Sequence, residues 1–575
     1  MPVHNLAVTA IFNKVADLLD IEGANAFRIR AYRNAARTIS SLSRDVSDMI
    51  ESGEDLTDLP GIGKDLAQKI REIVETGSMA QLEELESKIP VELSMLMKLE
   101  GLGPKRVKAL YQNLGVSRLK ELKVAARKGK IRELEGFGGK TEKAILEALE
   151  DLEKKGGGKR IKLLEAEPIA HSLVDYLKET EGIKEITVAG SFRRRQETVG
   201  DLDILATVKK GSEVMDRFTN YEDVRKVVSK GKTKSSIVLR SGLQVDLRVV
   251  PQVSYGAALH YFTGSKAHNI AVRKLGVKNK LKINEYGVFR GKKRIGGRTE
   301  NEVYRSVNLP YIEPELREDW GELKSAREGT LPKLVSPDDL RGDLHTHTRE
   351  TDGHADLEEM ANGARERGYE YLAITEHSKR VTMVRGLDAK RLAKQIDEID
   401  RLNGELKDIV LLKGIEVDIL KDGSLDLPDD ILKELDLTVC SVHYDRKLSR
   451  GKMTERVIRA MDNPHFNIFA HPTGRLINER SPYEIDLERV MEAAKERGCL
   501  LEINANPDRL DLSGSSCKMA KTMGLKLALS TDAHSVTDLD FIRYGIDQAR
   551  RGWLEPGDII NTRSLKDLRK LLKRK

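Results

Sequence analysis

The stretch VAGSFRRRQETVGDLDIL, residues 188–205, decides the fold of the central part of the chain. It runs from the end of an apolar strand pattern through a Gly-Ser dipeptide and a basic segment into a second strand pattern. Side chains alternate along a strand, so Asp201 and Asp203 are expected on the same face. A D-x-D sequence alone is more often a surface turn, but the preceding Gly-Ser favours a functional site.

A third carboxylate supports this interpretation. Asp246 interrupts the apolar run QVDLRVV, where a buried charge is costly unless it is paired or binds a metal. Three convergent carboxylates suit two Mg²⁺ or Mn²⁺ ions, which activate an attacking hydroxyl and neutralise a leaving pyrophosphate. The pattern therefore predicts nucleotidyl transfer, with Asp201, Asp203 and Asp246 as the catalytic and metal-binding residues.

The flanking sequence predicts a multi-domain protein, since 575 residues exceed what one core supports. Residues 1 to about 155 show helical periodicity without strand patterns, and the glycine-rich run at 154–159 predicts a boundary. Residues 313–340, rich in proline and charge, are interpreted as a linker. From Arg341 onward, short apolar strands alternate with helices, which is typical of parallel βα units with chemistry at the strand ends.

Composition narrows the classes of protein further. Charged residues make up 33% of the chain, no segment could span a bilayer, and the N-terminus lacks an export signal, so a soluble cytoplasmic protein is expected. The three cysteines form no CxxC pair, which argues against a disulfide framework and a thiolate zinc site. A net charge of +7 is compatible with a polyanionic partner.

One pattern occurs three times in the helical part: LPGIGKDLAQKI from Leu59, LEGLGPKRVKAL from Leu99 and LEGFGGKTEKAI from Leu134. Glycines at a helix N-terminus let backbone N–H groups approach an anion, and the helix dipole favours a phosphate there. One copy alone is more often a tight turn, but three aligned copies resemble the helix-hairpin-helix motif, which binds DNA backbone without reading bases. The predicted contacts are Gly61, Gly63, Lys64, Gly101, Gly103, Lys105, Gly136, Gly138 and Lys140.

Histidines and carboxylates recur at strand ends in the last part of the chain. A single histidine there is usually structural, but nine candidate ligands in one domain predict a metal cluster of Zn²⁺, Mn²⁺ or Fe²⁺. The candidates are His345, His347, Asp352, His377, Glu416, His443, His471, Asp532 and His534.

GSFRRRQETVGDLDIL and YFTGSKAHNIAVR, the latter at residues 261–273, resemble the nucleotidyltransferase core of family X DNA polymerases. The resemblance covers roughly residues 1–315 and implies that Asp246 is the base toward the primer 3′-hydroxyl. It also implies contacts to dNTP and primer-template by Ser191, Arg194, Tyr261, Phe262, Gly264, Asn269 and Arg273. Lys69 matches the Schiff-base lysine of the family's lyase, but Asp65 replaces an expected phosphate-binding lysine. The favoured interpretation of Lys69 is therefore an exposed helix lysine, and a lyase lysine is the alternative.

Residues 341–575 resemble the PHP phosphoesterase family in the order and context of their ligands. The resemblance implies up to three metals: the first held by His345, His347, Glu416 and Asp532, the second by Glu416, His443 and His471, the third by Asp352, His377 and His534. Such a cluster would lower the pKa of a bound water for phosphodiester hydrolysis. Arg475, after the AHPTG sequence, is a candidate phosphate contact.

We therefore expect an all-α helix-hairpin-helix N-terminal part, an α+β palm and thumb, and a C-terminal α/β PHP barrel. The expected activity is gap-filling DNA polymerisation, with a PHP 3′–5′ exonuclease and an abasic-site endonuclease, in a monomer that acts on gapped or primer-template DNA with dNTPs. The alternatives are a PHP phosphatase with a DNA-binding N-terminal region and a non-catalytic scaffold. The expected domains are residues 1–90 (DNA-binding), 91–155 (fingers), 156–252 (palm), 253–315 (thumb), 316–340 (linker) and 341–575 (PHP).

Overall fold

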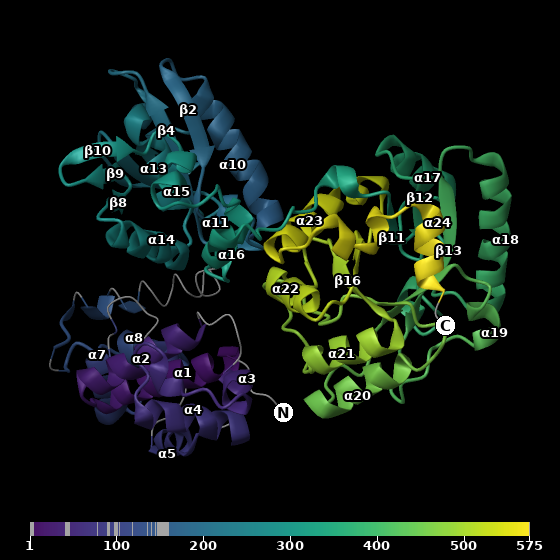
Figure 1. Cartoon of the computed structure of the whole chain (residues 1–575), viewed down its shortest axis with the longest axis horizontal. Coiled ribbons are helices and arrows are strands. Elements are labelled where there is room, and N and C mark those ends of the chain that lie inside the picture. The colour runs from purple at the N-terminus through teal and green to yellow at the C-terminus, as the bar shows by residue number, and fades with distance from the viewer. Residues whose placement is uncertain are drawn as a thin grey trace. The chain divides into compact units, whose positions relative to one another are not determined.

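The computed structural model divides into two compact units, residues 1–159 and 160–575 (Figure 1). None of its described helices is long and apolar enough to cross a membrane. The described residues are 5–40, 46–76, 79–88, 93–96, 102, 104–117, 119–134, 136–139, 141–143, 145–146 and 160–573.

The N-terminal unit is helical throughout its described residues, as its periodicity predicts. Its apolar positions form one core, in which Phe12 on α1 and Tyr32 on α2 meet edge to face with ring centroids 5.3 Å apart. The elements are α1 (Asn5–Glu22), α2 (Ala26–Ser40), α3 (Val46–Glu51), η1 (Leu56–Asp58), α4 (Lys64–Thr76), α5 (Ala80–Lys88), α6 (Leu93–Leu96), α7 (Pro104–Leu114) and α8 (Leu119–Arg127).

The second unit begins with a palm built on a five-stranded sheet in the order β2-β4-β7-β6-β5. β4 pairs in parallel with β7, and the other pairings of this sheet are antiparallel. Apolar residues of the sheet and of α10 form one core. The elements are β1 (Ile161–Lys162), α10 (Leu163–Lys178), β2 (Ile183–Val188), α11 (Gly190–Arg193), β3 (Thr198–Val199), β4 (Asp201–Val208), α12 (Val214–Thr219), β5 (Val224–Lys230), β6 (Lys234–Leu239) and β7 (Gln244–Val249).

The thumb follows with two helices, a three-stranded antiparallel sheet and a short helix. Apolar side chains such as Val272 and Val288 form its core. The core also holds a buried polar group, in which His268 Nδ1 lies 2.6 Å from Glu322 Oε1 and its Nε2 lies 2.9 Å from the Tyr304 hydroxyl. The elements are η2 (Gln252–Ser254), α13 (Tyr255–Thr263), α14 (Lys266–Lys278), β8 (Lys282–Asn284), β9 (Gly287–Arg290), β10 (Lys293–Gly296) and α15 (Glu300–Ser306).

The predicted linker at 316–340 contains packed structure. It contains α16 (Glu322–Glu328) between η3 (Pro314–Leu316) and η4 (Pro337–Asp339). Arg317 is fully buried and donates to Glu300 Oε1 at 2.5 Å, while Val335 lies in the core of the C-terminal barrel. Proline and charge indicated a linker, and the pattern does not reveal this buried ion pair because Glu300 belongs to the preceding thumb. The domain bounds themselves stay predictions.

The C-terminal part is a seven-stranded all-parallel sheet in sequence order, β11 to β17, curled into a nearly closed barrel. The first and last strands approach beyond their ends, where the His347 N–H donates to the Ala533 carbonyl at 2.8 Å. The strands are β11 (Gly342–Thr346), β12 (Tyr371–Ile374), β13 (Val410–Asp418), β14 (Leu437–Ser441), β15 (Ile468–Phe469), β16 (Leu500–Asn504) and β17 (Leu527–Ser530).

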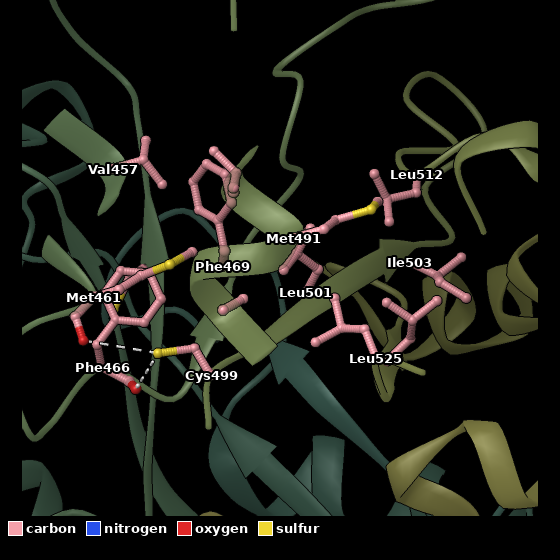
Figure 2. Close-up of a cluster of buried hydrophobic side chains, with 14 of the residues drawn as sticks. Val457, Met461, Phe466, Phe469, Met491, Cys499, Leu501, Ile503, Leu512 and Leu525 are labelled. Carbon is pink, nitrogen blue, oxygen red and sulfur yellow. Dashed lines mark hydrogen bonds between the residues drawn. The ribbon is translucent and has the colours of Figure 1, made fainter. Parts of the chain in front are cut away.

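Helices surround this barrel and bury its outer face. Figure 2 shows Val457 of α20, Met461 directly after that helix, Met491 of α21, and Leu501 and Ile503 of β16 in one apolar cluster. The elements are α17 (Leu357–Glu366), η5 (Thr382–Val384), α18 (Ala389–Glu405), α19 (Asp429–Leu432), α20 (Arg450–Ala460), α21 (Leu487–Arg497), α22 (Gly514–Thr522), η6 (Val536–Phe541), α23 (Ile542–Arg551), η7 (Pro556–Asp558), η8 (Ile560–Thr562) and α24 (Leu565–Leu572).

Candidate metal centres

The palm brings its carboxylates to one edge of the sheet. Asp203 on β4 is the direct register partner of Asp246 on β7, and Asp201 lies two residues before Asp203 on the same face. Burial raises the pKa of Asp203 to about 6, and the neighbouring charges of Asp201 and Asp246 act in the same direction. This concentration of negative charge fits a divalent cation.

Asp246 is already partly neutralised by basic side chains. Lys234 Nζ lies 2.8 Å and Arg248 Nη2 3.8 Å from Asp246 Oδ2. Burial opposes ionisation of Asp246, but hydrogen bonds from Lys234, Ser236 and Gln244 bring its pKa below the usual value. Asp246 is therefore a carboxylate, and Lys234 competes with any cation for it.

The residues predicted to contact nucleotide lie next to this edge. Ser191 is in the first turn of α11, after Gly190, whose φ of +66° suits glycine. Arg194 Nη1 donates to the Thr263 carbonyl at 2.5 Å, and Arg194 Nε donates to Glu318 Oε1 at 3.0 Å.

The other predicted contacts come from α13 and α14. Tyr261 and Phe262 meet edge to face, with ring centroids 5.1 Å apart, and Asn269 Nδ2 donates to the Tyr261 carbonyl at 2.7 Å. At Gly264, φ is +70°, and a Cβ would lie 3.2 Å from Arg194 Nη1. Arg273 is exposed on α14. The structure thus groups these residues, while their roles toward nucleotide stay predictions.

The nine candidate ligands of the barrel converge at the carboxyl ends of its strands. Their donor atoms form three groups, within each of which all atoms lie within 4.8 Å of one another; among the described residues, the palm carboxylates form no such group. The groups are His347, Asp352, His377 and His534; His345, His347 and Asp532; and His377, Glu416 and His443. His471 joins them through Nε2, 3.0 Å from Glu416 Oε1.

This grouping differs in part from the one that the resemblance implies. His347 lies with Asp352 as well as with Asp532, and His377 lies with Glu416 as well as with Asp352. The Nε2 atoms of His345 and His347 are only 3.1 Å apart. Shared ligands of this kind suit a compact cluster of several cations.

Unmet polar atoms inside the cluster fit a metal. His347 Nδ1 is buried and makes no hydrogen bond in the structure, and Glu416 Oε2, although only 2.7 Å from His377 Nδ1, has no partner with hydrogen-bond geometry. Burial lowers the pKa of His347 to about 3, with the nearby His534 and His377 acting in the same direction, so its ring is neutral and its nitrogens can ligate. Burial opposes ionisation of Glu416, but His377 and His443 hold its pKa well below the usual range.

Four buried carboxylates next to the candidate ligands were not predicted from the sequence: Asp343, Glu376, Asp418 and Glu502. Glu502 Oε1 lies 2.7 Å from His345 Nδ1, and its Oε2 accepts from the His471 backbone N–H at 2.7 Å. Such partners orient the ligand rings and fix their tautomers. The signal was present in the sequence, because an acidic residue in an otherwise apolar strand requires a partner.

Two single-residue expectations change in the structure. Arg475, expected to contact phosphate, instead pairs with Glu197 of the palm at 2.6 Å and donates to the Arg509 carbonyl at 2.8 Å. Lys69 is half-buried rather than exposed, because its ammonium bonds Asp65 at 2.7 Å and lies 5.4 Å from the Tyr32 ring centroid. Burial opposes protonation of Lys69, but the bond to Asp65 raises its pKa above the usual value.

The first and third helix-hairpin-helix repeats share one backbone geometry. Gly61 and Gly136 both have φ of +80°. The N–H group after this glycine donates to the carbonyl of the leucine that begins the repeat, Leu59 or Leu134. The carbonyl of the second glycine, Gly63 or Gly138, then accepts a helical hydrogen bond at 2.9–3.0 Å. Gly63 and Lys64 are exposed, as are Gly136 and Gly138. Gly101, Gly103 and Lys140 lie outside the described residues, and so does the side chain of Lys105, which is in the first turn of α7.

Together these features define a class: a nucleotidyltransferase palm with helix-hairpin-helix modules and a parallel barrel whose strand ends gather residues that could hold metal ions. Family models agree. They match a helix-hairpin-helix domain (residues 3–79), a SAM-like helix-hairpin-helix tandem (93–151), the DNA polymerase beta palm (160–260), the DNA polymerase beta thumb (258–318) and a PHP domain (343–506).

Similar proteins narrow the class to one family. The "DNA polymerase/3'-5' exonuclease PolX" of Bacillus subtilis (strain 168) is 37% identical over 577 residues, 100% of both chains. A "Probable phosphatase" of Thermoanaerobacter sp. (strain X514) is 31% identical over 236 residues, 38% of this chain and 89% of the phosphatase. The chain belongs to the family X DNA polymerases that carry a C-terminal PHP domain. The expected family and fold class are thereby confirmed.

Proposed function

We propose that the chain is a DNA polymerase that fills gaps during repair, with a 3′–5′ exonuclease in its PHP barrel. The carrying observation is the presence of two separate acidic centres, in the palm and in the barrel, on a chain similar along its whole length to a polymerase and exonuclease. The proposed substrates are gapped or primer-template DNA and dNTPs. The protein would act as a monomer, because both centres lie on this one chain. Opening of abasic sites would be a second activity of the barrel.

In the palm, Asp201, Asp203 and Asp246 would hold two Mg²⁺ or Mn²⁺ ions, which supply charge neutralisation and an activated primer hydroxyl. Asp246 is ionised and adjoins Lys234, so it can take the proton of the 3′-hydroxyl while Lys234 limits the negative charge. Arg194, fixed by Glu318 and the Thr263 carbonyl, orients the triphosphate.

In the barrel, the nine ligands would hold up to three Zn²⁺, Mn²⁺ or Fe²⁺ ions, which would lower the pKa of water for hydrolysis of the terminal phosphodiester. Glu502 orients His345, and the barrel end keeps the ligands in a buried setting. The product of each cleavage would be a mononucleotide. A lyase role is not assigned to Lys69, because a protonated amine cannot attack an aldehyde.

Paired substitutions test the two-centre proposal. Asp201→Ala should abolish extension of a gapped duplex with dNTPs and Mg²⁺ or Mn²⁺ while Mn²⁺-dependent exonuclease activity remains. The double change His345→Ala and His347→Ala should do the reverse. If either variant lost both activities while keeping its unfolding temperature, the two-centre proposal would fail. Hydrolysis of small phosphate esters without exonuclease activity would instead favour the phosphatase.

A further inference from the structure

A group of guanidinium groups stands beside the barrel centre. The arginine cluster comprises Arg446, Arg480 and Arg509, each in a loop that follows one of three successive strands, β14, β15 and β16. Parallel strands present their carboxyl ends at the same rim, so these loops lie at the end that holds the metal ligands. Arg446 and Gly474 each come three residues after a ligand, His443 and His471 respectively.

Two of the arginines meet at a single backbone oxygen. Arg446 Nη2 donates to the Gly474 carbonyl, and Arg480 donates to the same oxygen from Nη2 at 3.0 Å and from Nε at 3.2 Å. Gly474 has φ of +58°, and a Cβ there would lie 3.0 Å from Arg446 Nη2 and 2.6 Å from the Tyr483 ring. Glycine is therefore required for the two side chains to converge.

These two like charges have no counter-charge at contact distance. Among the residues that the structure describes, no carboxylate lies within 4.0 Å of the guanidinium nitrogens of Arg446 or Arg480. Asp511, nearby, accepts at Oδ2 from the Thr473 and Gly474 N–H groups at 2.9 Å each. Arg446 Nε is buried without a hydrogen-bond partner. Burial lowers the pKa of Arg480 to about 10, with Arg446 and Arg509 acting in the same direction, yet it stays charged at neutral pH.

The third arginine connects this pair to the metal ligands. Arg509 Nε lies 3.5 Å from Asp532 Oδ2, a member of one ligand group. Asp511 attracts Arg446 and Glu479 attracts Arg480, but neither carboxylate forms an ion pair with them. A phosphate anion bound between these arginines and the metal ligands would therefore stabilise their charges further. Arg475, which the sequence suggested as the phosphate contact, is occupied by Glu197.

We propose that Arg446 and Arg480, with Arg509 at the metal edge, form a phosphate-binding site for the backbone of a DNA strand whose 3′ end enters the barrel centre. The inference rests on the proposed exonuclease function. The site reads no base, since guanidinium groups bind phosphate oxygens regardless of sequence.

The probe is a single-stranded oligonucleotide with a free 3′-hydroxyl, digested by the full-length chain with Mn²⁺. Arg446→Ala and Arg480→Ala should each raise KM on the order of tenfold, because each removes a charge-assisted hydrogen bond to phosphate, with kcat nearly unchanged. The slope of log KM against log salt should fall by about 0.7 for each arginine that no longer neutralises a phosphate. Arg459→Ala is the matched control, because Arg459 is an exposed arginine of the same barrel that also donates to a carbonyl, that of Asp422.

A second probe locates the bound phosphate. Oligonucleotides with one neutral methylphosphonate at successive linkages from the 3′ end should show one or two positions where wild-type KM rises. At those positions the Arg446→Ala and Arg480→Ala double variant should gain no further penalty. Arg446→Lys should fall between wild type and Arg446→Ala, and unfolding temperatures should show that each variant is folded.

Other outcomes decide against the site. An unchanged KM, or a loss of kcat at constant KM, would overturn the proposal, the latter because the arginines would then serve the metal centre alone. If the wild-type chain had no exonuclease activity, the proposed function would fail first. The affinity for the same oligonucleotides, measured by fluorescence anisotropy without metal, would then decide. A methylphosphonate that weakens binding to the wild type but not to the double variant supports the site. Equal binding of all oligonucleotides by the wild type overturns it.

Discussion

Asp203 is the residue through which acidity should control the palm centre. Burial and two neighbouring carboxylates raise its pKa to about 6 in the metal-free protein. A proton and a cation compete for the same oxygens, so a raised pKa means that metal binding weakens as the pH falls below about 6 and is fully developed above it. The half-saturating Mg²⁺ concentration for primer extension should rise by up to about tenfold per pH unit below this value.

Saturating Mg²⁺ should relieve much of that dependence, which separates competition at Asp203 from acid damage to the fold. The measurement is extension rate against Mg²⁺ concentration between about pH 5 and pH 7.5. A half-saturating concentration that stays flat across this range would contradict the assignment of Asp203 as a metal ligand.

Glu502 offers a second test at the scale of one residue. It bonds His345 Nδ1 at 2.7 Å and the His471 N–H at 2.7 Å, so Glu502→Gln should loosen two ligands without removing either. Metal affinity of the barrel should fall about 10–100-fold, measured by metal content after dialysis against graded chelator, with primer extension intact. Glu496→Gln, at an exposed position of the same barrel, serves as the control. Full metal retention in Glu502→Gln would show that the ligands need no such support.

These residues also show what the sequence could reveal. Asp201 and Asp203 were predictable because period two is a local rule, and His345 with His347 followed from the same rule. Glu502 and Glu197 were not assigned, because their partners lie 157 and 278 residues away along the chain. Lys69 was misjudged for a similar reason: its burial depends on Tyr32 of another helix.

At the scale of elements, the turn before α4 contains two glycines with different roles: Gly61 allows a positive φ, and Gly63 leaves space for a phosphate. Gly61 has φ of +80° with only Asn34 Cβ, 3.9 Å away, near an added Cβ, whereas Gly63 has ordinary φ and no neighbour within 4 Å. Gly61→Ala should therefore cost about 1–2 kcal/mol through left-handed strain, seen as faster hydrogen exchange in α4. Gly63→Ala should leave exchange unchanged and lower only the affinity for duplex DNA, because a methyl group blocks close phosphate approach. Equal loss of protection in both variants would refute this division.

Elements also mark the limit of pattern reading. The strand order of the barrel follows from the alternation of strands and helices, since consecutive parallel strands are neighbours in most such folds. The packed state of α16 did not follow, because it depends on Glu322 meeting His268 and on Arg317 meeting Glu300. Both partners come from the thumb, so the composition of residues 313–340 indicated only a linker.

At the scale of the whole second unit, palm and barrel are joined by buried charges. Arg195, in the basic segment after Ser191, bonds Glu167 at 2.6 Å and Asp547 of barrel helix α23 at 2.7 Å. Arg551, one turn along α23, donates to the Arg194 carbonyl at 2.8 Å and to Glu318 at 3.0 Å. Because Glu318 also accepts a hydrogen bond from the Arg194 side chain, the barrel helps to hold Arg194 in the predicted nucleotide site.

Arg195→Ala should consequently affect both halves of this unit. Its removal breaks the ion pair of Asp547, whose side chain is 12% exposed, while Glu167, 5% exposed, keeps its pair with Arg543 at 2.8 Å. Loss of one partner of a buried pair costs about 3–5 kcal/mol. Denaturant unfolding of the full chain should show that loss, together with a higher KM for dNTP as Arg194 loses its support. Arg401→Ala, which breaks only the exposed pairs with Glu398 and Glu405, should change stability by less than about 1 kcal/mol. If Arg195→Ala matched Arg401→Ala in stability and in KM, the ion pairs of Arg195 would contribute nothing to stability. The nucleotide site of the palm would then not depend on the barrel.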